Sequence, residues 1–368
     1  MDDKKDMHLL KEWYQKYLTD PQALILALLL VVGTAVIIIF GDILTPVLAS
    51  LVIAYMLEGL VRFLQRYRLP RMLAVLTVFL SFVAFLAVVF FVLLPSLSIQ
   101  VAEAVTELPA MIAKVQHQLM RLPERYPEII TREQLLDMLK VFQTGLVKMG
   151  ENLLSYSMAS VRGLITFLVY LILMPLMVYF FLKDKEKLLA WFSTYLPDNR
   201  HLSIQVWHEV DQQIGNYIRG KFWEILIIWS VSWVAFYFLK LKFAMLMGLL
   251  VGLSVIVPYI GVTVTTIPVA LMGFYQWGPS QEVVYLLVAY GIIQLLDGNL
   301  LAPLLLSEVV NIHPVGIITA VLFFGGIWGF WGVFFAIPLA TLVLAVLKAW
   351  PHKEANAESE QGESNQPS

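Results

Sequence analysis

An acid, a glycine and an amide interrupt one of the most apolar stretches of this sequence. They are Asp297, Gly298 and Asn299, inside residues 284–303, a segment long enough to cross a membrane. Polar groups at that depth are costly in lipid, so protein must satisfy them or they must line water. The Asp297 carboxyl group could titrate, pair with a cation or hold a polar solute. Alternatively, it caps a helix end, with Gly298 breaking one helix and Asn299 starting the next.

A second interruption, Pro258-Tyr259-Ile260-Gly261, splits the apolar run of residues 243–276. It leaves backbone carbonyl groups unpaired, as in the broken helices that line transporter sites. It also offers the Tyr259 hydroxyl group. Pro258, Tyr259 and Gly261 are therefore candidates for a substrate or ion pathway. A plain kink that aids helix packing is the alternative.

Two further features lie after this region. His313-Pro314 resembles a helix start, since proline suits a first helical turn, and a proton-relay role for His313 is the sharper alternative. A glycine series then places small residues three apart, which favours close helix contact, with a flexible gate as the alternative. The series comprises Gly325, Gly326, Gly329 and Gly332.

Acidic residues in the earlier apolar runs have plainer interpretations. Glu224 lies three residues after Lys221, and we interpret the two as an exposed or interfacial ion pair. Glu58 is either a buried partner or a side chain that extends towards Arg62 and the basic residues around it.

The composition indicates a membrane protein. Of 368 residues, 59% are hydrophobic and 14% are charged, whereas about a quarter of an ordinary soluble protein is charged. The chain contains no cysteine, which excludes disulfides and thiolate metal sites, and no nucleotide-binding or metalloprotease motif is present. The net charge of −2 gives no sign of nucleic-acid binding. We expect no metal, no cofactor and no enzymatic activity.

Hydropathy predicts an all-α polytopic membrane protein with about eight transmembrane segments, the last three broken or re-entrant, plus a small helical extramembrane insertion. Gly41-Asp42 separates the first two apolar runs, and 222–239 is a span preceded by an amphipathic helix. The predicted segments are an N-terminal cytoplasmic segment (1–23), helices 1–3 (24–97), a periplasmic insertion (98–157), helix 4 (158–182), a cytoplasmic amphipathic region (183–221), a core of broken helices (222–349) and a disordered cytoplasmic tail (350–368).

The distribution of Lys and Arg predicts that both termini lie in the cytoplasm. The short polar segments 1–23, 62–71 and 183–221 are rich in basic residues, and the rule discounts the long 98–157 segment. Charge counting does not distinguish two geometries for 243–276 and 283–306, which either span the membrane with a kink or form re-entrant hairpins. In both geometries the interruptions lie inside protein.

Several motifs, in this order and spacing, resemble those of the autoinducer-2 exporter family of bacterial membrane proteins. The resemblance implies a multi-pass protein of the bacterial inner membrane that forms homo-oligomers, and it adds Gln294 to the candidate pathway. The family often has Glu at the position of Asp297. The aspartate keeps the negative charge, but its side chain is shorter than that of glutamate. The matching motifs are Asn216-Tyr217-Ile218-Arg219-Gly220-Lys221, Pro258-Tyr259-Ile260-Gly261, Gln294-x-x-Asp297-Gly298-Asn299-x-x-x-Pro303, Asn311-x-His313-Pro314 and the 325–338 run.

Three functions remain open from the sequence. The first is a secondary transporter or permease that exports a small polar solute, such as an autoinducer-like molecule. The second is a sodium(lithium)/proton antiporter, which needs a carboxylate such as Asp297 inside the bundle. The third is a non-transporting scaffold that holds a periplasmic partner through residues 98–157. The expected partners are the lipid bilayer, a small solute or a monovalent cation and protons, and further copies of the chain.

Overall fold

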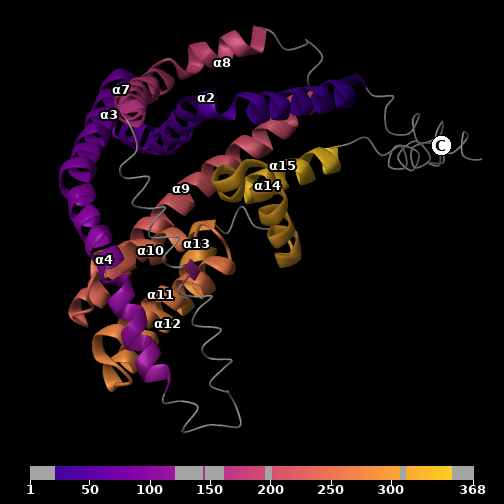
Figure 1. Cartoon of the computed structure of the whole chain (residues 1–368). Coiled ribbons are helices and arrows are strands. Elements are labelled where there is room, and N and C mark those ends of the chain that lie inside the picture. The colour runs from indigo at the N-terminus through magenta and orange to yellow at the C-terminus, as the bar shows by residue number, and fades with distance from the viewer. Residues whose placement is uncertain (1–20, 121–143, 146–160, 195–200, 307–311, 350–368) are drawn as a thin grey trace, which may run out of the picture. The chain divides into compact units, whose positions relative to one another are not determined.

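The computed structural model describes residues 21–120, 144–145, 161–194, 201–306 and 312–349 (Figure 1). Within these ranges the longer elements are helices, and none is a strand. Residues 1–20 of the predicted N-terminal segment (1–23), most of the insertion after residue 120 and the tail after residue 349 lie outside the described residues.

The helices follow one another along nearly the whole described chain. In order they are α2 (Pro21–Arg66), α3 (Arg71–Val88), η1 (Val89–Leu93), α4 (Leu94–Leu119), α7 (Val161–Lys183), α8 (Lys185–Thr194), α9 (His201–Phe238), α10 (Ala244–Ser254), α11 (Ile260–Trp277), α12 (Gln281–Leu296), η2 (Asp297–Leu301), α13 (Ala302–Leu306), α14 (Pro314–Phe334) and α15 (Ala336–Ala349).

Many of these helices are long and apolar enough to cross a bilayer. Six segments meet that standard, and two shorter apolar helices, Val169–Lys183 and Ala244–Ser254, accompany them. The prediction of an all-α, multi-pass membrane protein is confirmed.

Two of the predicted helix boundaries are wrong. α2 runs through Gly41 and Asp42 without a break, and α9 joins the predicted amphipathic helix to the predicted span in one helix. A glycine inside a helix costs only about 1 kcal/mol relative to alanine, which a long run of apolar residues outweighs. α2 is roughly 69 Å long at 1.5 Å per residue, about twice the thickness of a hydrocarbon core.

Asp297-Gly298-Asn299 does not end a helix either. The backbone stays helical from α12 to α13 and widens to a π-helical turn, η2. The same device occurs between α3 and α4 as η1. Each π-turn ends two residues before a proline, Pro95 or Pro303. Proline removes a hydrogen bond and crowds the preceding turn, and a wider turn absorbs both effects. Residues 281–306 are therefore one helix and not a hairpin.

Pro258–Gly261 does separate two helices. α10 ends at Ser254 and α11 begins at Ile260, with Tyr259 in a left-handed conformation (φ 64°). A Cβ on Gly261 would lie 1.8 Å from the Ser254 carbonyl oxygen, so only glycine allows this approach. α10 has 11 residues and reaches only about 16 Å, too short for a simple crossing.

The chain forms two compact units, and α2 and α9 contribute to both. The second unit comprises residues 50–183 and 218–307 and has two apolar cores. One core joins α9, α10, α11 and α12, through residues such as Phe236, Val251 and Val269. The other joins α2, α3 and α7, through Val61, Val75 and Val178. α4 packs against α10 and α11 (Figure 1), and Gln100 accepts a hydrogen bond from the Leu246 amide (3.2 Å).

The first unit comprises residues 1–49, 184–217 and 308–368. α14 begins at Pro314, as the His313-Pro314 pair predicts, and bends at Gly329, whose φ is +57°. A Cβ on Gly332 would lie 1.9 Å from the Phe324 carbonyl oxygen, so the chain folds back closely on itself there. The Tyr217 hydroxyl donates to the Phe334 carbonyl group at 3.0 Å.

Candidate functional site

A buried ion pair lies on α9, inside the second unit. The Lys221 ammonium contacts a Glu224 carboxylate oxygen at 2.9 Å, and the two residues are 3% and 2% exposed. The interpretation of this pair as exposed or interfacial is wrong. One helical turn separates the two residues, as expected, but the face that carries them packs inward because Ile228, Ser232 and Phe236 continue it as buried residues.

Asp297 lies beside this pair. It is 7% exposed, and it interacts electrostatically with both Glu224 and Lys221. Its Oδ1 atom is buried without a hydrogen-bond partner in the described part of the chain. When all three side chains are ionised the cluster carries one net negative charge, because two carboxylates share one ammonium group. We call Lys221, Glu224 and Asp297 the buried charge cluster.

A glycine brings the two helices of the cluster together. Gly220 directly precedes Lys221 on α9, and a Cβ at this position would lie 2.5 Å from the Leu305 carbonyl oxygen of α13. The Leu306 side chain would be 2.8 Å away. Without a side chain at residue 220, the backbone of α9 can approach α13 closely enough to set Lys221 and Glu224 against Asp297.

The buried face of α12 extends the polar region. Tyr290, Gln294 and Asp297 are spaced four and three residues apart, so they share one face of the helix. Both amide atoms of Gln294 are buried and lack hydrogen-bond partners among the described residues. Unsatisfied buried polar atoms are rare in native proteins and indicate an unrecorded water, ion or ligand, or a functional role.

Hydroxyl groups continue this face where α12 meets α11. The Tyr290 hydroxyl donates to the Val262 carbonyl group (2.9 Å) and accepts from Thr266 (3.3 Å). Thr265, which is buried, lies 3.0 Å from the same hydroxyl. The polar side chains of α12 therefore connect the charge cluster to the start of α11, immediately after the Pro258–Gly261 turn.

The other residues predicted for the pathway are placed differently. Asn299 is exposed, and its side-chain amide donates to the Leu295 carbonyl group of its own helix (2.8 Å). Gly298 is exposed, and a Cβ there would meet nothing within 4 Å. Pro258 and Tyr259 form the turn before α11, with Tyr259 57% exposed. The structure thus brings Asp297 and Gln294 into the polar face and leaves Asn299 out of it.

The remaining predicted residues belong to the first unit. His313 is exposed, and its Nδ1 atom accepts a hydrogen bond from the Val315 amide (3.3 Å), which caps α14. Gly325 and Gly332 lie at close contacts within α14, and Gly326 does not. Gly329 provides the bend.

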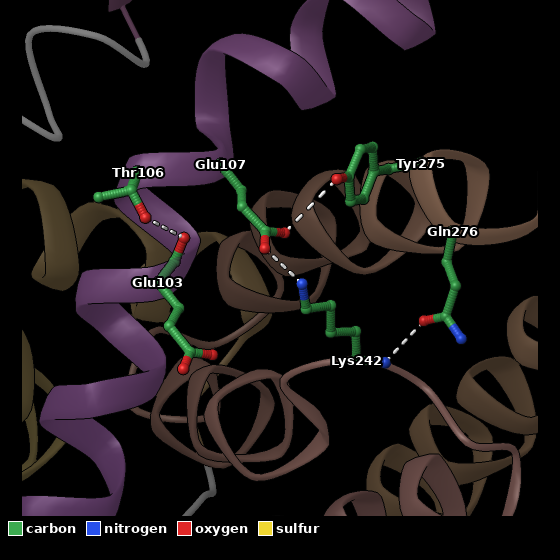
Figure 2. Close-up of polar contacts among 6 residues, drawn as sticks. All are labelled: Glu103, Thr106, Glu107, Lys242, Tyr275 and Gln276. Atoms are coloured by element: carbon green, nitrogen blue, oxygen red, sulfur yellow. Dashed lines mark hydrogen bonds and ion pairs between the residues drawn. The ribbon is translucent and has the colours of Figure 1, made fainter.

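Another ion pair of the second unit joins the middle of α4 to the turn before α10 (Figure 2). Lys242, in the turn before α10, contacts Glu107 of α4, and the Tyr275 hydroxyl donates to the same carboxylate (3.4 Å). Gln276 bonds the Lys242 amide and the Lys240 carbonyl group, each at 2.7 Å. The hydrogen bond to Glu107, more than any nearby charge, raises the pKa of Lys242. We call these contacts the Glu107 tether.

The chemistry of the buried charge cluster suits a small polar species. Among the described residues, no group of three or more His, Cys, Asp or Glu side chains could hold a metal ion. Two carboxylates, one ammonium group and one amide can instead bind hydrogen-bonding solutes, a monovalent cation or a proton. Lys221, Glu224 and Tyr290 were not predicted as site residues: the sequence showed Lys221 and Glu224 only as an ion pair, and Tyr290 only as a polar residue in an apolar helix.

Comparison with known proteins assigns the chain to a family. The model described as "AI-2E family transporter" matches residues 26–352. "Putative permease PerM" of Escherichia coli (strain K12) is 43% identical over 345 residues, which cover 94% of this chain and 98% of that protein. "Putative transport protein YueF" of Bacillus subtilis (strain 168) is 25% identical over 342 residues, covering 89% and 90%. "AI-2 transport protein TqsA" of Escherichia coli (strain K12) is 24% identical over 345 residues, covering 88% and 92%. This multi-pass membrane protein belongs to the AI-2E transporter family.

Proposed function

We propose that this chain is a secondary transporter of the bacterial inner membrane that exports a small polar solute through the second unit. An autoinducer-like molecule is the solute class at family level, since one relative is named for AI-2 transport. Both termini lie in the cytoplasm, in keeping with the distribution of basic residues, and the chain forms homo-oligomers. The buried charge cluster and Gln294 contact the solute or its coupling ion.

One observation carries this proposal. Three ionisable side chains lie buried among apolar helices, and one carboxylate oxygen of the three, Asp297 Oδ1, has no hydrogen-bond partner among the described residues. Ionisable groups inside a membrane domain are expensive and mark substrate or ion pathways. The neighbouring Gln294 amide, also unpartnered, adds donors and an acceptor for a polar solute.

A sodium(lithium)/proton antiporter is the second candidate, and the charge balance of the cluster favours it. Two carboxylates against one ammonium group leave room for one positive charge. A bound proton or monovalent cation would neutralise the cluster, and exchange between the two would couple their movements.

The test uses the purified full-length chain in liposomes. Autoinducer-2 efflux from loaded vesicles is measured for the native chain, for Asp297→Asn and for Glu282→Gln. Glu282 is a matched control, because it is an exposed carboxylate at the start of the same helix. Loss of efflux in Asp297→Asn alone supports the cluster as the site, and equal efflux in both variants refutes that assignment.

A second measurement separates the two candidates. Sodium or lithium is added to vesicles that contain a pH-sensitive dye. Cation-driven proton movement that Asp297→Asn abolishes identifies the antiporter. Movement of neither solute nor protons, in vesicles that contain folded native protein, contradicts both candidates and favours the scaffold alternative.

A further inference from the structure

The turn between α2 and α3 concentrates positive charge on the surface of the second unit. Arg62, Arg66 and Arg68 are exposed, and they lie within seven residues of one another. Arg68 has φ 65°, which holds the reversal between the two helices. The turn is closed by hydrogen bonds from the amides of Tyr67 and Arg68 to the last turn of α2, each at 3.0 Å.

The described residues neutralise only part of this positive charge. Glu58 contacts Arg62 at 3.6 Å and Arg71 at 3.8 Å, so one carboxylate serves two guanidinium groups. In the described part of the chain Arg66 and Arg68 take part in no ion pair. Two exposed guanidinium groups therefore remain available at the tip of the turn.

The fold adds Lys183, a further cation from a distant part of the sequence, to the arginine residues of this turn. Arg71 donates to the Leu182 carbonyl group at 3.2 Å, which fixes the end of α7 beside the start of α3. The next residue, Lys183, is exposed and lies over the Tyr179 ring. The apolar core of α2, α3 and α7 holds this arrangement in place.

Two exposed aromatic side chains accompany the basic residues. Phe63 is 52% exposed and Tyr67 is 68% exposed, with their ring centroids 5.2 Å apart. Aromatic side chains concentrate where a membrane meets water, with apolar bodies towards the chains and polar edges among the headgroups. The pattern fits a surface at the headgroup level, at the end of apolar helices.

We propose that this surface binds the phosphodiester headgroup of an anionic phospholipid. Arg66, Arg68 and Lys183 contact the phosphate, and Phe63 and Tyr67 lie against the lipid beside it. Guanidinium groups form paired hydrogen bonds with phosphate oxygens, and basic residues next to membrane segments attract anionic lipids. Since basic loops concentrate on the cytoplasmic side, the lipid belongs to the cytoplasmic leaflet.

The test titrates the full-length chain in detergent micelles with phosphatidylglycerol or with phosphatidylcholine of the same acyl chains. Native mass spectrometry counts bound lipid, and tryptophan fluorescence follows the thermal unfolding midpoint. We expect the native chain to bind phosphatidylglycerol at least about tenfold more tightly. Salt at about 1 M should remove most of this preference, because it shortens the Debye length to about 3 Å.

Variants then locate the site. Arg66→Gln with Arg68→Gln should lose the preference, and Arg66→Lys with Arg68→Lys should keep most of it. Lys240→Gln is the matched control, because Lys240 is also an exposed basic residue with positive φ (57°) in a turn after a helix. This control should bind phosphatidylglycerol as the native chain does.

Three outcomes would overturn the proposal. In the first, the native chain shows no preference for phosphatidylglycerol over phosphatidylcholine, which excludes an anionic headgroup site even if the variants fail to fold. In the second, the Gln double variant has the native unfolding midpoint in phosphatidylcholine and still prefers phosphatidylglycerol, which places the lipid elsewhere. In the third, inorganic phosphate stabilises the chain and displaces the lipid at equal concentration, which indicates a free-anion site.

Discussion

Among the described residues of the second unit, two lysine–carboxylate pairs lie in opposite environments. Lys221 and Glu224 are 3% and 2% exposed, and a second carboxylate, Asp297, lies beside them. In the Glu107 tether, the Lys242 and Glu107 side chains are 42% and 30% exposed. In both pairs the charged atoms are in direct contact, so the pairs differ in how far water reaches them.

Burial changes what an ion pair does. Water already stabilises exposed charges, so an exposed pair contributes about 0–1 kcal/mol. A buried pair loses the solvation of both charges, which costs several kcal/mol per ion. Removing one partner then leaves an uncompensated buried charge. Burying the three charged side chains of the cluster is therefore costly for the fold. The tether, in contrast, only joins α4 to the ends of α10 and α11.

The largest effect should follow removal of the buried ammonium group. Lys221→Met leaves Glu224 and Asp297 as uncompensated neighbours, so we expect a loss of roughly 3–5 kcal/mol in stability. The measurement is the unfolding midpoint of the purified full-length chain in detergent micelles. Lys221→Met with Glu224→Met should recover much of the loss. A single variant as stable as the native chain would contradict the buried pair.

Gly220 tests the buried pair from another side, because it lets α9 approach α13 and so brings Lys221 and Glu224 near Asp297. A Cβ at 2.5 Å from the Leu305 carbonyl oxygen forces α9 away from α13, and such overpacking costs about 1–3 kcal/mol. We expect Gly220→Ala to lower the unfolding midpoint and the efflux together. Gly291→Ala is the control, because a Cβ there meets nothing within 4 Å. It should be neutral or slightly stabilising, and equal losses in both variants would refute the close approach.

Asp297→Asn should separate stability from activity. The substitution removes one of two neighbouring negative charges and keeps the side-chain volume, so stability should change by at most about 1 kcal/mol, and upward. Efflux should fall sharply. Unfolding curves and liposome efflux on the same preparation provide the test, and a large loss of stability would indicate that Asp297 serves only the fold.

The smallest effect belongs to the tether. Glu107→Gln should cost less than about 1 kcal/mol, and the difference from the native chain should vanish in high salt. Because the folded-state pKa of Lys242 is raised, its contribution is fully present below the ordinary lysine value of about 10.4 and is lost as pH rises through the raised pKa. Native chain and Lys242→Met should therefore converge in stability only in strongly alkaline solution. Convergence already near pH 8 would contradict this assignment.

The π-turn at Asp297 shows that residue types alone do not predict where a helix ends. Gly298 and Asn299 are residue types that commonly end helices, but the helix continues through both, so the prediction of a break there was wrong. A π-turn, like the one before Pro95, accommodates Pro303 without interrupting the helix. Pro258–Gly261 carried a similar signal and does separate two helices, because Gly261 packs against the Ser254 carbonyl group. The residue types at the two interruptions do not distinguish a widened turn from a break between helices.

The sequence alone determined the environment and the class of this protein. Apolar runs of membrane length, few charges and no cysteine require helices in lipid, and Asp297 stood out because a charge there is costly. Only the tertiary structure decided which polar residues share the interior. Lys221 and Glu224 are near one end of an apolar run, where a sequence allows either water or protein around them. They became buried neighbours of Asp297 because α9 turns that face inward and Gly220 lets α9 approach α13.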